Sequence, residues 1–187
     1  MVDQQQVIAQ FQEYFDAFQN YDFDQEGRLN VYGTVIAKDQ YLSRMPNKQL
    51  PFRFGRVEGD FNVSYCGLNT FEGMPYYVKH TCWISHNPAT TLVGLPKHCN
   101  NLVMEGLSEL ASFDGFPDQV DLCRFTWYPQ QPLLRLLHAK RLQLGIPDNP
   151  ARKVVDILKN YAGQGQKGAL ACAAELAKAG FKDNARW

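Results

Sequence analysis

Net charge, long apolar runs and membrane signals are scarce in this 187-residue chain. Nineteen basic side chains balance nineteen acidic ones, and nonspecific binding of nucleic acid needs an excess of basic charge. No stretch approaches the roughly 20 apolar residues that span a bilayer. Residues 1–10 are polar and lack the basic and apolar regions of a signal peptide. We therefore expect a cytoplasmic protein with no membrane contact.

Paired metal-ligand motifs are missing as well. The chain has five cysteines, an odd number, and no CxxC pair. Cys82 and His86 lie four positions apart, and His98 adjoins Cys99, but zinc sites usually combine two such tightly spaced pairs. We expect the thiols to be small core residues in a reducing compartment, and we expect no bound metal.

The signals for catalysis and for cofactors are weak. Gly163, Gly165 and Gly168 match the GxGxxG pattern, but a helical segment precedes them where a dinucleotide site needs a strand. No GxSxG motif marks a nucleophile. We expect no cofactor and no catalytic residue. A small enzyme or a metal-binding protein remains an alternative.

What the chain does have is a repeat. Residues 71–75, 92–96 and 113–117 all read apolar, any residue, Gly, apolar, Pro, and successive copies are 21 residues apart. A fixed period in the low twenties is typical of a solenoid with one strand in each coil. The pattern predicts short parallel strands whose apolar residues stack from coil to coil, at residues 60–64, 81–85, 102–106 and 123–127.

The segments on either side differ from the repeat. Apolar spacing predicts an amphipathic helix over residues 7–18, and alternation over residues 29–35 predicts a strand from a degenerate first coil. The period fails after Gln131, since Leu136 stands where a fourth Gly is due. We expect an α+β protein with three parts: an N-terminal helix and turn (1–27), a short irregular leucine-rich-repeat-like parallel β-solenoid with capping segments (28–147), and a C-terminal helical hairpin (148–187).

Residues 59–75, GDFNVSYCGLNTFEGMP, resemble the GDFNCSxNxLTSLxGxP repeat of phage and bacterial leucine-rich-repeat-like proteins. Residues 50–57 are similar to the LPxKFGxV segment that precedes such repeats. The resemblance implies a phage-encoded intracellular repeat protein and provides no catalytic residues. We expect it to bind and inhibit a host protein, such as a component of a defence system.

The variable strand positions are the candidates for binding that partner. Trp83 and Met104 are 21 residues apart, and Phe125 follows after another 21, at the position that Asn62 holds in the preceding coil. If Asn62 faces solvent, these three side chains form an exposed apolar column typical of a protein interface. The alternative is that a terminal helix covers the column.

A late basic group gives a second hypothesis, a nucleic-acid-binding accessory protein. Its six members are Arg124, Arg135, Lys140, Arg141, Arg152 and Lys153. The candidate partner-binding residues are Trp83, Met104, Phe125, Tyr76, Tyr77, Arg124, Arg135, Lys140 and Arg141.

Overall fold

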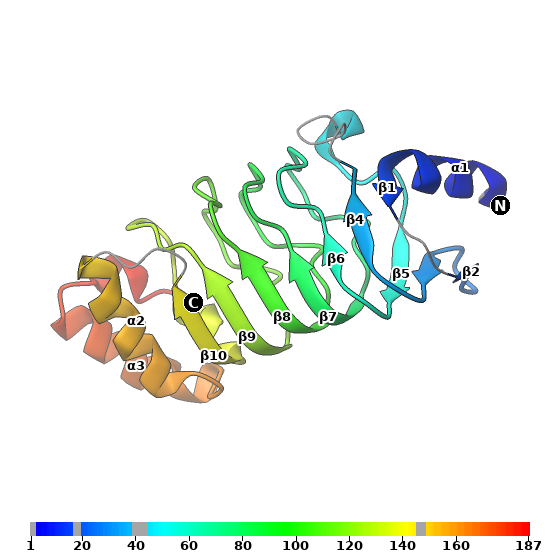
Figure 1. Ribbon diagram of the computed structural model, residues 1–187. Coiled ribbons are helices and arrows are strands. Elements are labelled where there is room, and N and C mark those ends of the chain that lie inside the picture. Colours follow the sequence, from blue (N-terminus) through cyan, green and yellow to red (C-terminus); the bar gives the residue numbers. More distant parts are fainter. Residues whose placement is uncertain (1–2, 17–19, 39–44, 145–148) are drawn as a thin grey trace.

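The computed structural model describes residues 3–16, 20–38, 45–144 and 149–187. It is an α+β protein built on a parallel β-solenoid of about five turns, with about 21 residues in each coil. Figure 1 shows helix α1 (Gln4–Tyr14) at one end of the solenoid and helices α2 (Asn149–Tyr161) and α3 (Gln166–Lys178) at the other. The predicted fold class is confirmed.

The first coil contains two short strands, β3 (Leu29–Val31) and β4 (Val35–Ala37), where the sequence predicted one strand over residues 29–35. They pair in parallel with the second coil and antiparallel with two N-terminal strands, β1 (Phe15–Asp16) and β2 (Tyr21–Phe23). The sheet therefore extends into residues 1–27, where the sequence predicted only a helix and a turn.

Helix α1 ends earlier than its periodicity predicted. Phe15 adopts an extended conformation, pairs with Ala37 in the sheet and places its ring 5.4 Å from that of Phe54. Burial of this aromatic ring in the core favours leaving the helix at Tyr14. Phe18, the predicted last residue of the helix, lies outside the described residues.

The remaining strands all pair in parallel: the two short strands of the second coil both pair with the first seven-residue strand, and the later strands follow in chain order. Strands β7, β8 and β9 begin four residues before the predicted positions, because Val78, Cys99 and Val120 lie inside the strands rather than between coils. An irregularity after Val78 interrupts the alternation that marks a strand in the sequence. The bounds are β5 Phe54–Val57, β6 Phe61–Asn62, β7 Tyr77–Trp83, β8 His98–Met104, β9 Gln119–Phe125 and β10 Ala139–Leu144.

Buried side chains stack from coil to coil and form the core. Phe71, Leu92 and Phe113, the first residues of the three motifs, are each at most 1% exposed. Burying such a side chain contributes roughly 1.5–3 kcal/mol, so these columns supply much of the stability. The inward residues of one line across the strands are Phe61, Cys82, Leu102, Cys123 and Leu142.

The three motifs form the same turn. Gly73, Gly94 and Gly115 have φ of +88°, +99° and +89°, and the N–H of the fourth motif residue donates to the first carbonyl at 3.0–3.2 Å. This pattern is a turn that needs positive φ at its third position. A Cβ on Gly94 would lie 2.4 Å from the carbonyl carbon of Phe71, one coil back, so glycine is also needed for close stacking.

The 21-residue period fails after Gln131, as the sequence indicates, but one more strand joins the sheet within residues 28–147. Strand β10 pairs with β9 in parallel, with Ala139 opposite Val120. The coil reaches this register through a 3-10 helix, η3 (Leu134–His138), in place of the glycine turn. Leu136 is fully buried there, so this coil still supplies an apolar side chain to the core although it lacks the glycine motif.

The two C-terminal helices form the predicted hairpin and close the end of the core. Helix α3 ends with Gly180 at φ +93° and a hydrogen bond of 2.8 Å from the N–H of Phe181 to the carbonyl of Leu176, which is a Schellman cap. Its buried face holds Gly168, Cys172 and Leu176. Leu170 of the same helix is 85% exposed and does not belong to that face.

Candidate partner-binding site on the outer face of the sheet

The terminal helices cap the two ends of the solenoid and leave the outer face of its sheet uncovered among the described residues (Figure 1). Phe11 of α1 packs against Phe52 and Phe54 at the N-terminal end. Helix α2 packs against β10, and α2 and α3 both contact η3. The alternative that a terminal helix covers the strand residues is therefore wrong for the described part of the chain.

The predicted exposed column of Trp83, Met104 and Phe125 is wrong. Met104 is 2% exposed and Phe125 is fully buried, so both belong to the core. Trp83 is half-buried on the outer face, where it pairs with Val103 rather than with Met104.

The cause is a difference in the spacing of inward residues that the 21-residue period conceals. The two inward residues of β7, Val78 and Cys82, are four positions apart, whereas the matching residues of β8, Cys99 and Leu102, are three apart. Leu102 lies eleven positions before Phe113, whereas Cys82 lies ten positions before Leu92, so the glycine motifs keep their spacing of 21. Within the strands the register slips by one residue, and such a slip exchanges inward and outward side chains.

One line of outward residues, which we call the Trp83 row, runs across every coil. Each member is the pairing partner of the next, so neighbouring members are one strand spacing apart, about 4.8 Å. The row is acidic at its N-terminal end, apolar in the middle and basic near its C-terminal end. Its members are Asp16, Ile36, Asn62, Trp83, Val103, Arg124 and Gln143.

The middle of this row forms the floor of an open pocket of about 390 Å³, which we call the Trp83 pocket. Ile36, 44% exposed, lies toward one end, and the ion pair of Arg124 with Glu105, with Nε 2.7 Å from Oε1, toward the other. Tyr65 and His86 also line it. A lining that combines large apolar side chains with polar groups such as Asn62 and Glu105 is typical of a binding site.

Tyr65 and His86 have an uncommon backbone conformation. Their φ angles are +60° and +56°, and Gly106 holds the next corresponding position at +66°. The two rings stack 4.3 Å apart at 11°, and a Cβ on Gly106 would lie 2.2 Å from the His86 ring. A left-handed conformation costs a side-chain-bearing residue roughly 1–2 kcal/mol, a cost that glycine avoids.

Among the predicted basic residues, three pair with carboxylates. Besides Arg124, Lys140 lies 2.7 Å from Asp121, and Arg135 lies 2.8 Å from Asp114. The hydrogen bond from Lys140 lowers the pKa of Asp121. Arg124, Lys140 and Arg141 are on the strands, whereas Arg135 lies in η3 beside the turns. The structure therefore does not gather the late basic residues into one cationic surface.

The two predicted tyrosines differ in setting. Tyr77 lies in the sheet between the Arg56 guanidinium, 5.2 Å from its ring centre, and His98, whose ring stacks 5.2 Å away at 4°. Tyr76 is 45% exposed, with the Arg28 guanidinium 5.2 Å from its ring centre. Neither points into the core, and Tyr77 stabilises neighbouring coils by stacking.

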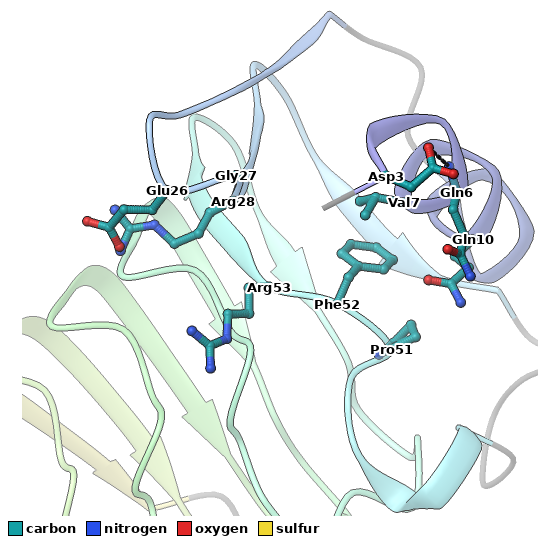
Figure 2. Close-up of a pocket in the computed structure, with 10 residues that line it drawn as sticks. All are labelled: Asp3, Gln6, Val7, Gln10, Glu26, Gly27, Arg28, Pro51, Phe52 and Arg53. Carbon is teal, nitrogen blue, oxygen red and sulfur yellow. Dashed lines mark hydrogen bonds and ion pairs between the residues drawn. The ribbon is translucent and has the colours of Figure 1, made fainter. Parts of the chain in front are cut away.

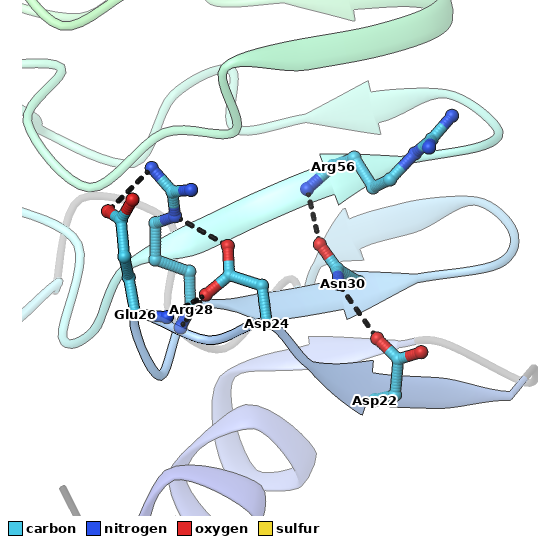
Figure 3. A network of polar contacts seen from close by, with 6 residues as sticks. All are labelled: Asp22, Asp24, Glu26, Arg28, Asn30 and Arg56. Carbon is cyan, nitrogen blue, oxygen red and sulfur yellow. Dashed lines mark hydrogen bonds and ion pairs between the residues drawn. The ribbon is translucent and has the colours of Figure 1, made fainter.

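A second hollow, of about 450 Å³, lies between α1 and the turn that precedes β3 (Figure 2). Its lining carries both charge signs, including Asp3, Glu26, Arg28 and Arg53. Arg28 is held by Asp24, with Nε 2.7 Å from Oδ2, and by Glu26, as Figure 3 shows. These contacts fix the turn.

The neighbouring amide network ties three strands together (Figure 3). Asn30, 8% exposed, donates to Asp22 at 2.7 Å and accepts from the backbone N–H of Arg56 at 3.0 Å. Hydrogen bonds from Tyr32 and Asn30 lower the pKa of Asp22. These polar groups therefore serve to hold the three strands together.

All five cysteines are unpaired and buried, in agreement with their predicted place in the core. Burial raises the pKa of the Cys66 and Cys99 thiols to about 12. In the described ranges, no three His, Cys, Asp or Glu side chains are grouped closely enough to hold a metal ion.

Gly163 and Gly165, with φ of +78° and +51°, form the turn between α2 and α3. None of the described helices has the length and apolarity to cross a membrane.

Comparison of the chain with protein-family models, curated proteins and solved structures found no match. The resemblance to phage repeat proteins therefore rests on the motif, and the structure supports its solenoid part alone. Ile36, His86 and Glu105 line the pocket but were not predicted as site residues. His86 follows Tyr65 by 21 residues, a signal that could have identified the stacked pair.

Proposed function

We propose that this protein binds a protein partner without catalysis, through the Trp83 pocket. The observation that carries the proposal is that Tyr65 and His86, which form a wall of the pocket, occupy left-handed positions beside the half-buried Trp83. Gly106 shows that the fold accepts glycine at this position of a coil. Side chains kept at an energetic cost beside a pocket indicate a role for the side chains themselves.

The composition of the pocket supports a protein partner. Aromatic residues are enriched at the centres of protein interfaces, and charged residues are more common at the rim. The Trp83 pocket has this order, with Trp83 and Val103 in the middle and the pair of Arg124 with Glu105 at one end. Solenoids commonly bind partners along such extended surfaces.

The nucleic-acid hypothesis has less support. Polyanion binding requires cations that release counterions from phosphates. Arg124, Arg135 and Lys140 each lie within 3 Å of a carboxylate, which reduces the field that they offer. We expect little retention on heparin at 150 mM salt, and strong, salt-dependent retention would favour this second hypothesis.

We further propose that the partner is a host protein and that binding masks its active surface. This part of the proposal rests on the resemblance of residues 59–75 to phage repeat proteins. Inhibition of a defence component is the specific form that this hypothesis takes.

Affinity capture tests the proposal. Tagged wild-type protein, Trp83→Ala and His86→Gly are incubated with bacterial lysate, and retained proteins are quantified by mass spectrometry. We expect one dominant partner that both substitutions remove, because they open the floor and the wall of the pocket. Leu170→Ala is the matched control, since Leu170 is also apolar but lies exposed on α3.

Unfolding curves of the variants separate binding from stability. His86→Gly removes backbone strain and is expected to stay folded. A partner that is retained equally by wild-type protein and both pocket variants, or the absence of any protein partner, would contradict the proposal.

A further inference from the structure

The Trp83 row has the dimensions of an extended peptide. Asp16 and Trp83 are separated by three strand spacings, or about 14 Å at about 4.8 Å each. An extended chain advances about 3.3 Å per residue, so about four residues span this distance. Residues four apart in an extended chain point to the same side, so two side chains of one short peptide could reach both positions.

Hydrogen-bond donors along the row lack partners within the described chain. The Oδ1 atom of Asn62 accepts from the N–H of Ser64 at 3.0 Å, which leaves its Nδ2 group without an acceptor. No described residue accepts from Trp83 Nε1, and Glu105 binds only Nε of Arg124. A ligand here must present acceptors, and backbone carbonyls of a peptide are acceptors spaced along a line.

The charges of the row favour a basic ligand over a polyanion. Asp16 is exposed at the end of the row, and no described residue forms an ion pair or a hydrogen bond with its side chain. Glu105 is the other carboxylate, and Arg124 is the only cation in the row, so these groups sum to one negative charge. Phosphates would be repelled at Asp16, whereas a lysine or arginine side chain would be attracted.

We infer that the Trp83 row binds an extended peptide segment of the partner, with a large apolar side chain in the Trp83 pocket and a basic side chain about four residues away, at Asp16. The inference rests on the proposed function and specifies its ligand. The Tyr65 and His86 rings form the wall against which the apolar side chain packs. Asn62, Trp83 and Arg124 donate to the carbonyls between the two anchors.

The test uses a random linear heptapeptide library displayed on phage, selected on the full-length protein. Enriched sequences are synthesised with a fluorophore, and their Kd values are measured by anisotropy. We expect a consensus with a large apolar residue and Lys or Arg about four positions apart. Trp83→Ala should weaken binding at least about tenfold, as loss of an interface hot spot does.

Charge exchange tests the polarity of the row. Asp16→Lys should weaken binding of the selected peptides about two- to fivefold, the range for an exposed ion pair, and replacing their basic residue by Glu should restore it. Asp156→Lys, which changes an exposed carboxylate on α2, should leave the Kd unchanged.

The outcomes distinguish this inference from the proposed function. If no linear peptide is enriched, while a folded partner is captured in a manner that depends on Trp83, the inference is wrong and the proposed function stands. Enrichment of acidic peptides, or equal binding to Trp83→Ala, also overturns the inference. If neither a peptide nor a captured protein depends on Trp83, both are wrong.

Discussion

At the scale of single residues, two kinds of glycine have positive φ in this protein. Gly94 lies in a turn stacked on the coil before it, where a Cβ would lie 2.4 Å from a backbone carbon of Phe71. Gly180 ends helix α3 with φ of +93°, and a Cβ added there would meet nothing within 4 Å. Glycine is required at position 94 by both the positive φ and the close packing, and at position 180 by the positive φ alone.

Alanine substitution should separate these two requirements. We expect Gly94→Ala to lower the free energy of unfolding by at least about 3 kcal/mol, because strain and overpacking add. Gly180→Ala should cost about 1–2 kcal/mol, from conformation alone. Urea unfolding followed by circular dichroism measures both, and equal losses would contradict the stacking explanation.

At the scale of elements, helix α3 shows how a helix acts as a lid on an open core. Leu176 is fully buried against the end of the solenoid, whereas Leu170 is 85% exposed on the same helix. The two residues have the same intrinsic helix propensity, so a difference between them reports packing. Substituting each leucine by alanine therefore measures how much the packing of α3 on the core contributes to stability, with the change in helix propensity held equal.

Leu176→Ala should destabilise the protein by about 2–5 kcal/mol, since it leaves a cavity at the closed end of the core. Leu170→Ala should change stability by less than about 0.5 kcal/mol. Thermal and urea unfolding of both variants provide the comparison. A large loss for Leu170→Ala would mean that this side chain has a packing partner in solution.

The sequence predicts those elements that follow from local residue preferences, and it does not predict those that depend on tertiary packing. The turn motif predicted the solenoid because glycine at positive φ and the stacked Phe71, Leu92 and Phe113 are local consequences of the repeat. The pairing of Trp83 with Val103 was not predictable from that period, because register is a tertiary property. The strain at His86 is a backbone angle, which apolar periodicity does not encode.

At the scale of the whole molecule, the core contains an unusual amount of sulfur. Four of the five thiols lie within the coils, and Cys172 lies in α3. Burial raises the pKa of Cys172 to about 11 and those of Cys66 and Cys99 to about 12, from an ordinary value of 9.0. Folding therefore keeps these thiols protonated at pH values where the unfolded chain would ionise them.

The buried thiols should make the folded state less stable as the pH rises above 9. The raised pKa values favour the folded state fully below pH 9, and this stability is lost as the pH rises from 9 toward 11–12. We expect the free energy of unfolding in urea to fall between pH 8 and pH 10, by about 1.4 kcal/mol per thiol at one unit above the unfolded pKa. Cys99→Ala should reduce this slope, and an unchanged slope would contradict the explanation.

The shorter spacing of inward residues in β8 has a wider consequence. Because the residue missing between Cys99 and Leu102 is restored between Leu102 and Phe113, the turns stay aligned while the strand positions slip. One coil can thus have one residue fewer between its inward strand residues and one residue more before its turn, while the neighbouring coils keep their arrangement. A solenoid built this way can change which side chains it presents to a partner while its folding signals stay the same.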